Sequence, residues 1–542
     1  MAALPAWLIP LPDAETMRAI DRWAIDEQGV PGLDLMERAG TGVARAAERL
    51  APDGPVAVVC GKGNNGGDGL VVARLLREAG RQVRVACVGP PQDFGGDALV
   101  NLERLPGEPP AQVPSGPGPS IARQRAAVFD GATVVVDALL GTGFSGSPRG
   151  VVAESIAAIN DTGAPVVSVD VPSGVDASTG VVAEPAVRAT LTVTFHAAKP
   201  GLWIRPGKAY AGQVQTLDIG VPRGAPERAE VGLIAPSVLE RLPRRTACST
   251  KFTSGHVFVV GGSRGLTGAP RMAAQASMRA GAGYLTACVP TSLQAVVAGA
   301  GPPELMTRGL ADEDGALAEA AAGSALNETA RGGALALGPG LGRSEGAVAF
   351  ARRLARESRI ALVLDADGLN AHAGRLRELA DRQAPTVLTP HAGELARLLQ
   401  IDSAEIERGR LQHVVTAAQL ARAVVVLKGD DSLIAEPGGR VAVSPGASPA
   451  LATAGTGDVL TGVIAALLAQ GLDAFAAAAA GVWLHAEAGR EAARRQGAPE
   501  AVIASDVIDA LPAARARTPR QRAGGAEDTR AGGMAAFRSG AG

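Results

Sequence analysis

Three polar, glycine-rich loops in the first half of the chain each follow a short apolar run. The loop at 61–69 contains Asn-Asn-Gly-Gly-Asp and follows the apolar run at 56–60. The other two loops begin at Asp137 and Asp170, again directly after apolar residues. Open parallel sheets bind ligands at the carboxyl ends of their strands, and helix N-termini attract anions. One anionic ligand bound by all three loops is therefore predicted; taken singly, either Asp could be an ordinary turn residue.

A second candidate centre lies late in the chain, where Gly455-Thr-Gly-Asp458 opens a long apolar helical pattern. Glycines at a helix N-terminus leave backbone N–H groups free to hold an anion. The segment therefore predicts an anion site, and an ordinary helix cap is the alternative role for Asp458.

The elements that must position these residues alternate between strands and helices, twice over. The first series predicts strands at 56–60, 83–88, 133–137, 166–170 and 191–195. The second predicts strands at 256–260, 284–289, 334–337, 360–364, 386–388 and 423–427, then a hairpin near 432–435 and 441–443 and helices at 457–469 and 474–490. This alternation is typical of parallel sheets covered by helices on both faces, so the predicted fold class is α/β.

A glycine- and proline-rich segment at 220–226 separates the two series. Such a break is typical of a linker, and each series on its own is long enough to form a core. We therefore predict domains at 1–225 and 226–515, which fold independently of one another. The end of the chain is rich in Ala, Gly and Arg without periodicity, which predicts a disordered tail at 516–542.

The amino-acid composition indicates which classes of binding partner the protein can have. The 542 residues are 46% apolar and 20% charged, with a formal net charge of −2, which gives no attraction to nucleic acid or to an anionic membrane. The four cysteines lack metal or redox spacing, which suits a reducing cytoplasm. We predict a cytoplasmic homo-oligomer that binds small molecules, with neither a nucleic-acid nor a membrane partner.

The three loops of the first half, in this order, resemble the NAD(P)H-hydrate epimerase family, the YjeF N-terminal domain. The resemblance implies a Rossmann-like, three-layer αβα domain that binds hydrated NADH or NADPH. The implied binding residues are Asn64, Asn65, Gly66, Gly67, Asp68, Gly141, Thr142, Gly143, Phe144, Ser145, Gly146, Ser147 and Asp170. It also implies a potassium ion at Asn65, Asp137 and Ser173, whose oxygen atoms suit a hard cation.

The implied epimerisation reaction can use a carboxylate near the nicotinamide ring. Loss of the C6 hydroxyl, pushed by the ring nitrogen, gives a planar cation that water can attack from either face. A nearby carboxylate can shuttle protons and stabilise that cation, and Asp170 is the predicted catalytic residue. Lys199 is a second catalytic candidate, with a solvated lysine as its alternative reading.

The Gly-Thr-Gly-Asp458 segment resembles the ribokinase-like superfamily, in which this Asp deprotonates a substrate hydroxyl. Segments at 261–270, 337–342, 364–370, 388–394 and 427–432 narrow the resemblance to the ADP-dependent NAD(P)H-hydrate dehydratase family. The resemblance implies a catalytic Asp458 and a co-substrate ADP with Mg²⁺. It implies nucleotide binding by Lys428, Gly429, Asp430, Asp431, Ser432 and Gly457, and hydrated-cofactor binding by Gly340, His391 and Asp458.

Two details complete this second resemblance. Glu394 and Asn370 are candidate magnesium ligands. The segment Gly446-Ala-Ser-Pro-Ala450 departs from the family, many of whose members have Asn after the glycine.

The reaction implied is phosphorylation of the C6 hydroxyl by ADP, then loss of phosphate to restore the double bond, with AMP and phosphate released. The alternative is a small-molecule kinase fused to a nucleotide-binding or protein-interaction module. A kinase leaves phosphate on its product, whereas a dehydratase releases it. The motifs do not discriminate ADP from ATP, or NADH from NADPH.

Overall fold

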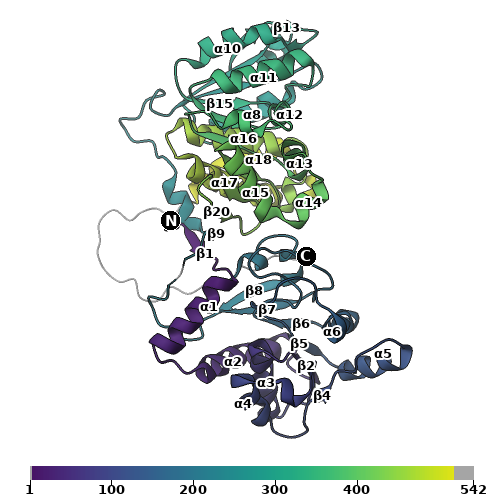
Figure 1. The fold of residues 1–542 in the computed structure, drawn as a ribbon. Helices are drawn as coiled ribbons and strands as arrows, with labels where there is room; N and C mark the ends of the chain where they lie inside the picture. Colours follow the sequence, from purple (N-terminus) through teal and green to yellow (C-terminus); the bar gives the residue numbers. More distant parts are fainter. Residues whose placement is uncertain (1–2, 227, 518–542) are drawn as a thin grey trace.

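Two open sheets organise the chain, one in each half (Figure 1). The structure, a computed structural model, describes residues 3–226 and 228–517. We call the elements around the first sheet the N-terminal unit and those around the second the C-terminal unit. The predicted tail at 516–542 lies, from residue 518 on, outside the described residues.

The sheet of the N-terminal unit has seven strands, all parallel. In spatial order they are β4 (Ala111–Gln112), β3 (Val83–Cys87), β2 (Val56–Cys60), β5 (Val134–Ala138), β6 (Val166–Val169), β7 (Leu191–Phe195) and β8 (Gln213–Leu217). The five predicted strands are confirmed, within a residue of their predicted bounds. The pattern missed β4, which is only two residues long, and β8, which is largely half-buried and mixes polar with apolar residues.

Alternation along β2 shows how the three layers form. Val58 and Cys60 pack with the helices α2 (Gly32–Leu50) and α3 (Asn64–Glu78) on one face. Ala57 and Val59 pack with α6 (Gly150–Asp161) on the other. Because successive side chains of a strand point to opposite faces, a wholly apolar strand needs helices on both. The predicted αβα arrangement of this unit is thereby confirmed.

The sheet of the C-terminal unit has eleven strands. Its centre is the parallel set β17 (Thr386–Leu388), β16 (Ala361–Leu364), β15 (Ala334–Leu337), β10 (His256–Val260), β11 (Tyr284–Pro290) and β12 (Met306–Leu310), with β18 (Val424–Leu427) beside β17. The predicted hairpin is confirmed as β19 (Leu433–Ala435) and β20 (Val441–Val443), antiparallel to each other. The helices α11 (Glu345–Glu357), α13 (Ala392–Leu399) and α15 (Arg410–Ala421) cover one face of this sheet.

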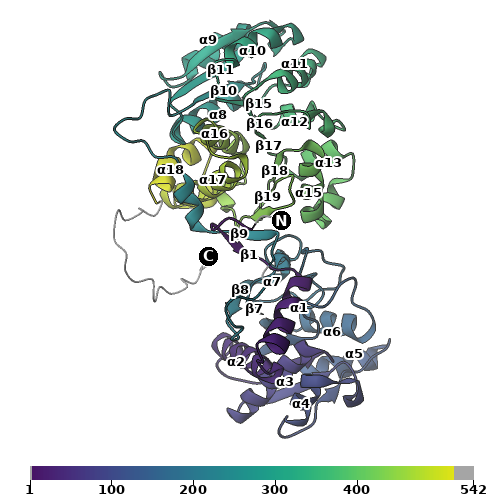
Figure 2. The same cartoon turned by 60° about the vertical axis from the view of Figure 1, so that its left-hand side comes forward.

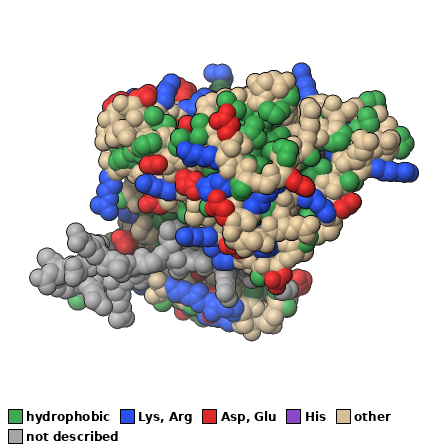
Figure 3. Space-filling model, turned by 90° about the horizontal axis from the view of Figure 1, so that it is seen from below, with side chains coloured by type: hydrophobic (Ala, Val, Ile, Leu, Met, Phe, Trp, Pro, Cys, Tyr) green, Lys and Arg blue, Asp and Glu red, His purple; other side chains and the backbone are tan. Residues whose placement is uncertain are grey.

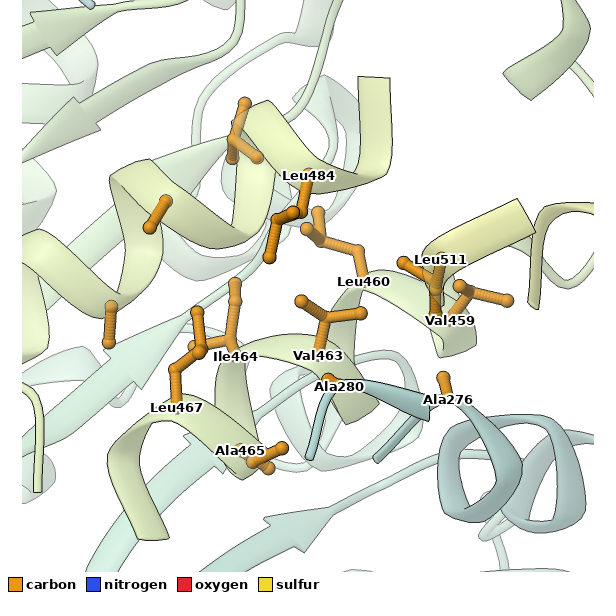
Figure 4. Packing of buried hydrophobic residues seen from close by; sticks show 14 of the residues in the cluster. Ala276, Ala280, Val459, Leu460, Val463, Ile464, Ala465, Leu467, Leu484 and Leu511 are labelled. Atoms are coloured by element: carbon orange, nitrogen blue, oxygen red, sulfur yellow. The ribbon is translucent and has the colours of Figure 1, made fainter. Parts of the chain in front are cut away.

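The other face is covered by α8 (Gly268–Arg279), α16 (Thr456–Ala469), α17 (Ala474–Gln496) and α18 (Ala504–Ala516). Figure 4 shows Val459, Val463 and Leu467 of α16 directed into this core, together with Leu484 and Leu511. A Cβ atom at Gly462 would lie 2.0 Å from the Ala273 carbonyl oxygen, so α8 and α16 pack closely only with glycine there. Each fully buried Leu or Val contributes roughly 1.5–3 kcal/mol, which fixes the start of α16 relative to the sheet.

Segments of the N-terminal 225 residues cross into the C-terminal unit. The strand β1 (Leu8–Pro10) pairs antiparallel with β9 (Val231–Ile234), which itself lies beside β20. Leu11 and Ile204 are fully buried within the core of the C-terminal unit. Figures 1 and 2 both show β1 and β9 at the boundary between the two units. The division at residue 225 stays a prediction, but these contacts oppose fully independent folding of the two pieces.

The surface carries both signs of charge. On the face that Figure 3 shows, Lys and Arg side chains are interspersed with Asp and Glu. Among the described residues, no helix combines the length and the apolarity needed to cross a membrane.

Candidate functional sites

The three polar loops of the N-terminal unit meet at the carboxyl edge of its sheet. The Thr142 hydroxyl and backbone N–H both donate to the Asp170 carboxylate, which joins the second loop to the third. The Ser173 hydroxyl donates to Asp137 over 2.6 Å, and the Asn65 side chain lies against Gly141. Because β2, β5 and β6 are neighbours in the sheet, their following loops are brought together as predicted.

An ion pair between Lys199 and Asp170 forms the centre of this site. The Lys199 Nζ lies 2.5 Å from Asp170 Oδ1, and it also donates to the Thr194 hydroxyl and to the Phe195 carbonyl. The lysine is 1% exposed, so of its two readings the structure excludes the solvated one. Asp170 has a φ of 66°, and this rare left-handed conformation aims its carboxylate at Lys199 and Thr142.

The carboxylates of this site have pKa values that are shifted in opposite directions. Burial alone would raise the pKa of Asp170, but the charge of Lys199 and hydrogen bonds from Lys199, Thr142 and Thr194 hold it below its usual value. Burial, with the nearby charges of Asp170 and Asp21, raises the pKa of Asp68 well above its usual value. Asp21 on α1 (Ala14–Arg22) also has a raised pKa, chiefly from burial. The sequence reasoning missed Asp21, because it lies in an amphipathic helix that is distant from the three loops in the sequence.

The first loop depends on glycine for its shape. A Cβ atom at Gly66 would lie 1.7 Å from the Gly61 carbonyl oxygen, so only glycine allows α3 to start this close to β2. Gly67 and Asp68 are buried near the start of α3, and Asn64 is exposed at its first position. In the second loop, Gly143 and the residues at 145–147 are exposed, whereas Gly141, Thr142 and Phe144 are half-buried. The predicted substrate residues thus include both buried and exposed positions, and Thr142 is bonded to Asp170.

The three predicted potassium ligands lie on neighbouring elements of this site. Asp137 is fully buried, and its carboxylate accepts hydrogen bonds from Ser168, Ser173 and the Leu139 N–H. Burial raises the pKa of Asp137, and these hydrogen bonds only partly offset it. The Asn65 amide nitrogen is buried without a hydrogen-bond partner among the described residues. A buried carboxylate bonded to neutral donors fits a monovalent cation, to which Asn65 could contribute only its amide oxygen, because the unsatisfied amide nitrogen is a hydrogen-bond donor.

The second site begins at the turn before α16. Gly455 has a φ of 90°, and the Thr456 hydroxyl donates to the Leu451 and Thr453 carbonyls, which fixes the turn. Gly457 and Asp458 follow in the first turn of the helix. Burial, with the charges of Asp365, Asp367 and Glu394, raises the pKa of Asp458 to about 7, while Lys428 opposes the shift. A carboxyl group with this pKa can accept a proton near neutral pH.

Lys428 connects the predicted nucleotide loop to this turn. Its Nζ lies 2.9 Å from Asp365 Oδ1 and 3.6 Å from Glu394 Oε2. Burial opposes the charge of Lys428, but these carboxylates raise its pKa above the usual value, so it stays a cation. The other Asp365 oxygen accepts from Thr461 on α16 over 2.8 Å. The sequence reasoning gave Asp365 no role, although it directly follows a strand, as Asp170 does.

His391 begins α13 and is half-exposed. Its Nδ1 accepts from the backbone N–H of Gly393 over 3.0 Å, and the Glu394 carboxylate accepts from the His391 backbone N–H. Burial lowers the pKa of His391, although Glu394 opposes the shift, so the ring is neutral near pH 7. Gly340, with a φ of 62°, lies in the loop after β15. A Cβ atom there would lie 2.5 Å from the Leu266 carbonyl oxygen.

The two candidate magnesium ligands are engaged elsewhere. The Asn370 side chain contacts Asp367 and Arg397, and Glu394 contacts Lys428 and His391. No group of three or more His, Cys, Asp or Glu residues is arranged to hold a metal within 3–226 and 228–517. The role of Glu394 and Asn370 as magnesium ligands stays a prediction.

The side chains of the predicted nucleotide loop are largely committed to other contacts. Asp431 is fully buried and pairs with Arg410 at 3.0 Å, and Asp430 pairs with Arg205 and Lys208. The Ser432 hydroxyl donates back to the Gly429 carbonyl over 2.7 Å. The loop can thus offer the Lys428 ammonium and backbone groups to a nucleotide, whereas both Asp side chains hold the loop in place.

Comparison with known proteins identifies the family. A sequence profile described as NAD(P)H-hydrate dehydratase matches residues 257–513, and one described as YjeF-related protein N-terminus matches 32–201. The two profiles thus match the two α/β units in the order that the sequence motifs predicted.

Two bifunctional relatives match this chain along nearly their whole length, and one solved structure matches about half of it. The bifunctional NAD(P)H-hydrate repair enzyme Nnr of Moorella thermoacetica is 41% identical, over 92% of this chain and 95% of its own. The enzyme of the same name from Salinibacter ruber is 42% identical, over 93% and 95%. A solved ADP/ATP-dependent NAD(P)H-hydrate dehydratase from Bacillus subtilis, co-crystallized with ATP/Mg²⁺, is 28% identical over 52% of this chain and 96% of its own, with a TM-score of 0.45. By the extent of its match to the two Nnr proteins, the chain belongs to the family of bifunctional NAD(P)H-hydrate repair enzymes.

Proposed function

We propose that the N-terminal unit interconverts the two C6 epimers of hydrated NADH or NADPH and that the C-terminal unit dehydrates the S epimer with ADP. The observation that carries this proposal is a pair of carboxylates with opposite shifts. The pKa of Asp170 is lowered beside Lys199, and the pKa of Asp458 is raised to about 7 in the first turn of α16. One carboxylate is held as an anion that can stabilise a cation, and the other is tuned to accept a proton.

In the N-terminal unit, the ionised Asp170 would face the nicotinamide ring while its charge is held by Lys199. The C6–O bond breaks as the ring nitrogen donates its electron pair, and hydroxide leaves as water once it is protonated. Water then adds to the planar cation from the other face and loses a proton. Lys199 or Thr142, both bonded to Asp170, can relay these protons. A potassium ion bound by Asn65, Asp137 and Ser173 would supply positive charge for the anionic phosphates.

In the C-terminal unit, Asp458 takes the proton of the C6 hydroxyl, and the hydroxyl oxygen forms a bond to the β-phosphorus of ADP. The bond from that phosphorus to the α,β-bridging oxygen breaks, and AMP leaves. The C6–O bond then breaks with loss of the C5 proton, which restores the C5–C6 double bond and releases phosphate. Phosphate is a much better leaving group than hydroxide, which is why a kinase-like site can serve a dehydratase.

The remaining residues of the second site bind and orient the two substrates. The Gly457 backbone N–H and the Lys428 ammonium are positioned to balance the charge of the transferring phosphoryl group, since a Cβ at Gly457 would lie 3.7 Å from Lys428 Nζ. Gly340 and the neutral ring of His391 are the proposed contacts of the hydrated cofactor. Mg²⁺ would arrive with the nucleotide, bound by its phosphates rather than by a dedicated protein cage.

A mixture of both epimers, incubated with the protein, tests the proposal. Without nucleotide, the epimers should interconvert with no recovery of the reduced-cofactor absorbance. With ADP and Mg²⁺, both epimers should return to NADH or NADPH, with one AMP and one phosphate released for each. A phosphorylated product that accumulates without phosphate release would instead support the kinase alternative. A cytoplasmic location and self-association stay predictions, and the cysteine spacing supports the first of them.

A further inference from the structure

The segment that follows Lys199 leaves the N-terminal site and enters the C-terminal unit. After a short turn of helix at Pro200–Leu202, Ile204 is fully buried among the side chains of the C-terminal core. Ala198 and Trp203 pack against the same core. The segment is therefore anchored in both units, with the ion-paired Lys199 at one end and α7 (Lys208–Ala211) at the other.

Directly after Ile204, this segment meets the predicted nucleotide loop at 428–432. The backbone N–H of Arg205 donates to Asp431 Oδ2 over 2.8 Å, and Arg410 donates to the same oxygen over 3.1 Å. The Arg205 guanidinium also pairs with the Asp430 carboxylate. Both acidic side chains of the loop are thus held by groups outside it.

Lys208 links this loop to the one before the anion turn. Its Nζ donates to the Asp430 carbonyl over 3.0 Å and to the Pro445 carbonyl over 3.5 Å, and it pairs with the Asp430 carboxylate at 3.3 Å. The Ala447 N–H donates to the same Asp430 carbonyl. Lys208 is only 19% exposed, so it is better shielded from solvent and salt than Arg205, which is 48% exposed.

We propose that Arg205 and Lys208 of the N-terminal unit are positioning residues for the nucleotide site of the C-terminal unit. The inference rests on the proposed function. Without the two cations, Asp430 would present an uncompensated negative charge beside an anionic nucleotide, and the loops at 428–432 and 445–447 would lose a shared anchor. The N-terminal unit thereby contributes to nucleotide affinity without touching the chemistry at Asp458.

The test compares ADP binding and steady-state kinetics in the full chain. In the double variant Arg205→Gln/Lys208→Met, the Kd for ADP by calorimetry and the KM for ADP should both rise by about tenfold, on the scale of one or two charge-assisted hydrogen bonds. The turnover at saturating ADP and the KM for hydrated cofactor should change far less. The charge-conserving variant Arg205→Lys/Lys208→Arg should restore most of the affinity. Arg104→Gln, after α4 (Gly96–Glu103) and remote from this contact, is the matched control and should bind ADP as wild type does.

An unchanged Kd for ADP in the double variant overturns the inference, as does an equal loss in all kinetic parameters with no rescue by the conservative pair. If the double variant does not fold by circular dichroism, the single variant Lys208→Gln decides by the same two measurements. Wild-type protein that binds no ADP would refute the proposed function instead, which separates the two failures.

Discussion

We expect the dehydration rate to fall as the pH is lowered, because the proposed base Asp458 has a raised pKa. Burial and three neighbouring carboxylates raise its pKa from 3.8 to about 7. A base acts only when deprotonated, so activity falls as the pH drops through 7 and levels off above it. The loss should approach tenfold for each pH unit, so that about 1% of the maximal rate remains at pH 5.

The neighbours of Asp458 predict how this profile moves. Asp367 is one of the carboxylates that raise the pKa of Asp458, and it is held by the Gly342 N–H at 3.0 Å and by Arg343 at 2.9 Å. The isosteric Asp367→Asn removes one negative charge, so the midpoint of the profile should shift to lower pH. Asp458→Ala should lose about 10²–10⁴-fold of the dehydration rate above pH 7, where the wild-type carboxylate is deprotonated, and leave epimerisation intact.

The assay is recovery of reduced-cofactor absorbance from the S epimer at saturating ADP and Mg²⁺, in a constant-ionic-strength buffer series. The control variant is Asp402→Asn, which removes a carboxylate at the start of another helix, α14 (Ser403–Arg408). It should leave the midpoint of the pH profile unchanged. A rate that is flat between pH 5.5 and 8, or an Asp458→Ala variant within a few-fold of wild type, would refute the assignment of Asp458 as the base.

Four further outcomes are expected. In a mixture of epimers with excess ADP, Asp170→Ala should consume the S form promptly and leave the R form to slow spontaneous epimerisation; clearance of both at the wild-type rate would contradict its role. Lys199→Met leaves a buried carboxylate uncompensated, so urea unfolding should show a loss of about 3–5 kcal/mol, and Asp170→Asn in the same chain should recover part of it. Exchange of potassium for a large organic cation should slow epimerisation, followed by chiral chromatography, and spare dehydration of the S form. Lys428→Met should raise the KM for ADP by more than tenfold, since the anionic nucleotide loses a charged partner, and an unchanged KM would remove Lys428 from the site.

The sequence alone determined the two sheets and most of their strands. Runs such as Val56–Cys60 and Ala334–Leu337 are apolar at every position, and a strand of a sheet covered on both faces buries every side chain of such a run. The loops at Asp137, Asp170 and Asp458 were predictable because they directly follow strands or open a helix, and these are local features. The family resemblance then supplied their chemistry.

Other features depend on contacts between residues far apart in the chain, which no local pattern encodes. The sequence could not decide whether Lys199 is solvated, because its burial depends on Asp170, Thr194 and the enclosing core. Asp21 and Asp365 join their sites only through the packing of a helix and the order of strands. Likewise, β1 and Ile204 precede the linker in sequence, yet both belong to the C-terminal unit, since a short strand and a single apolar side chain find their partners only in the assembled fold.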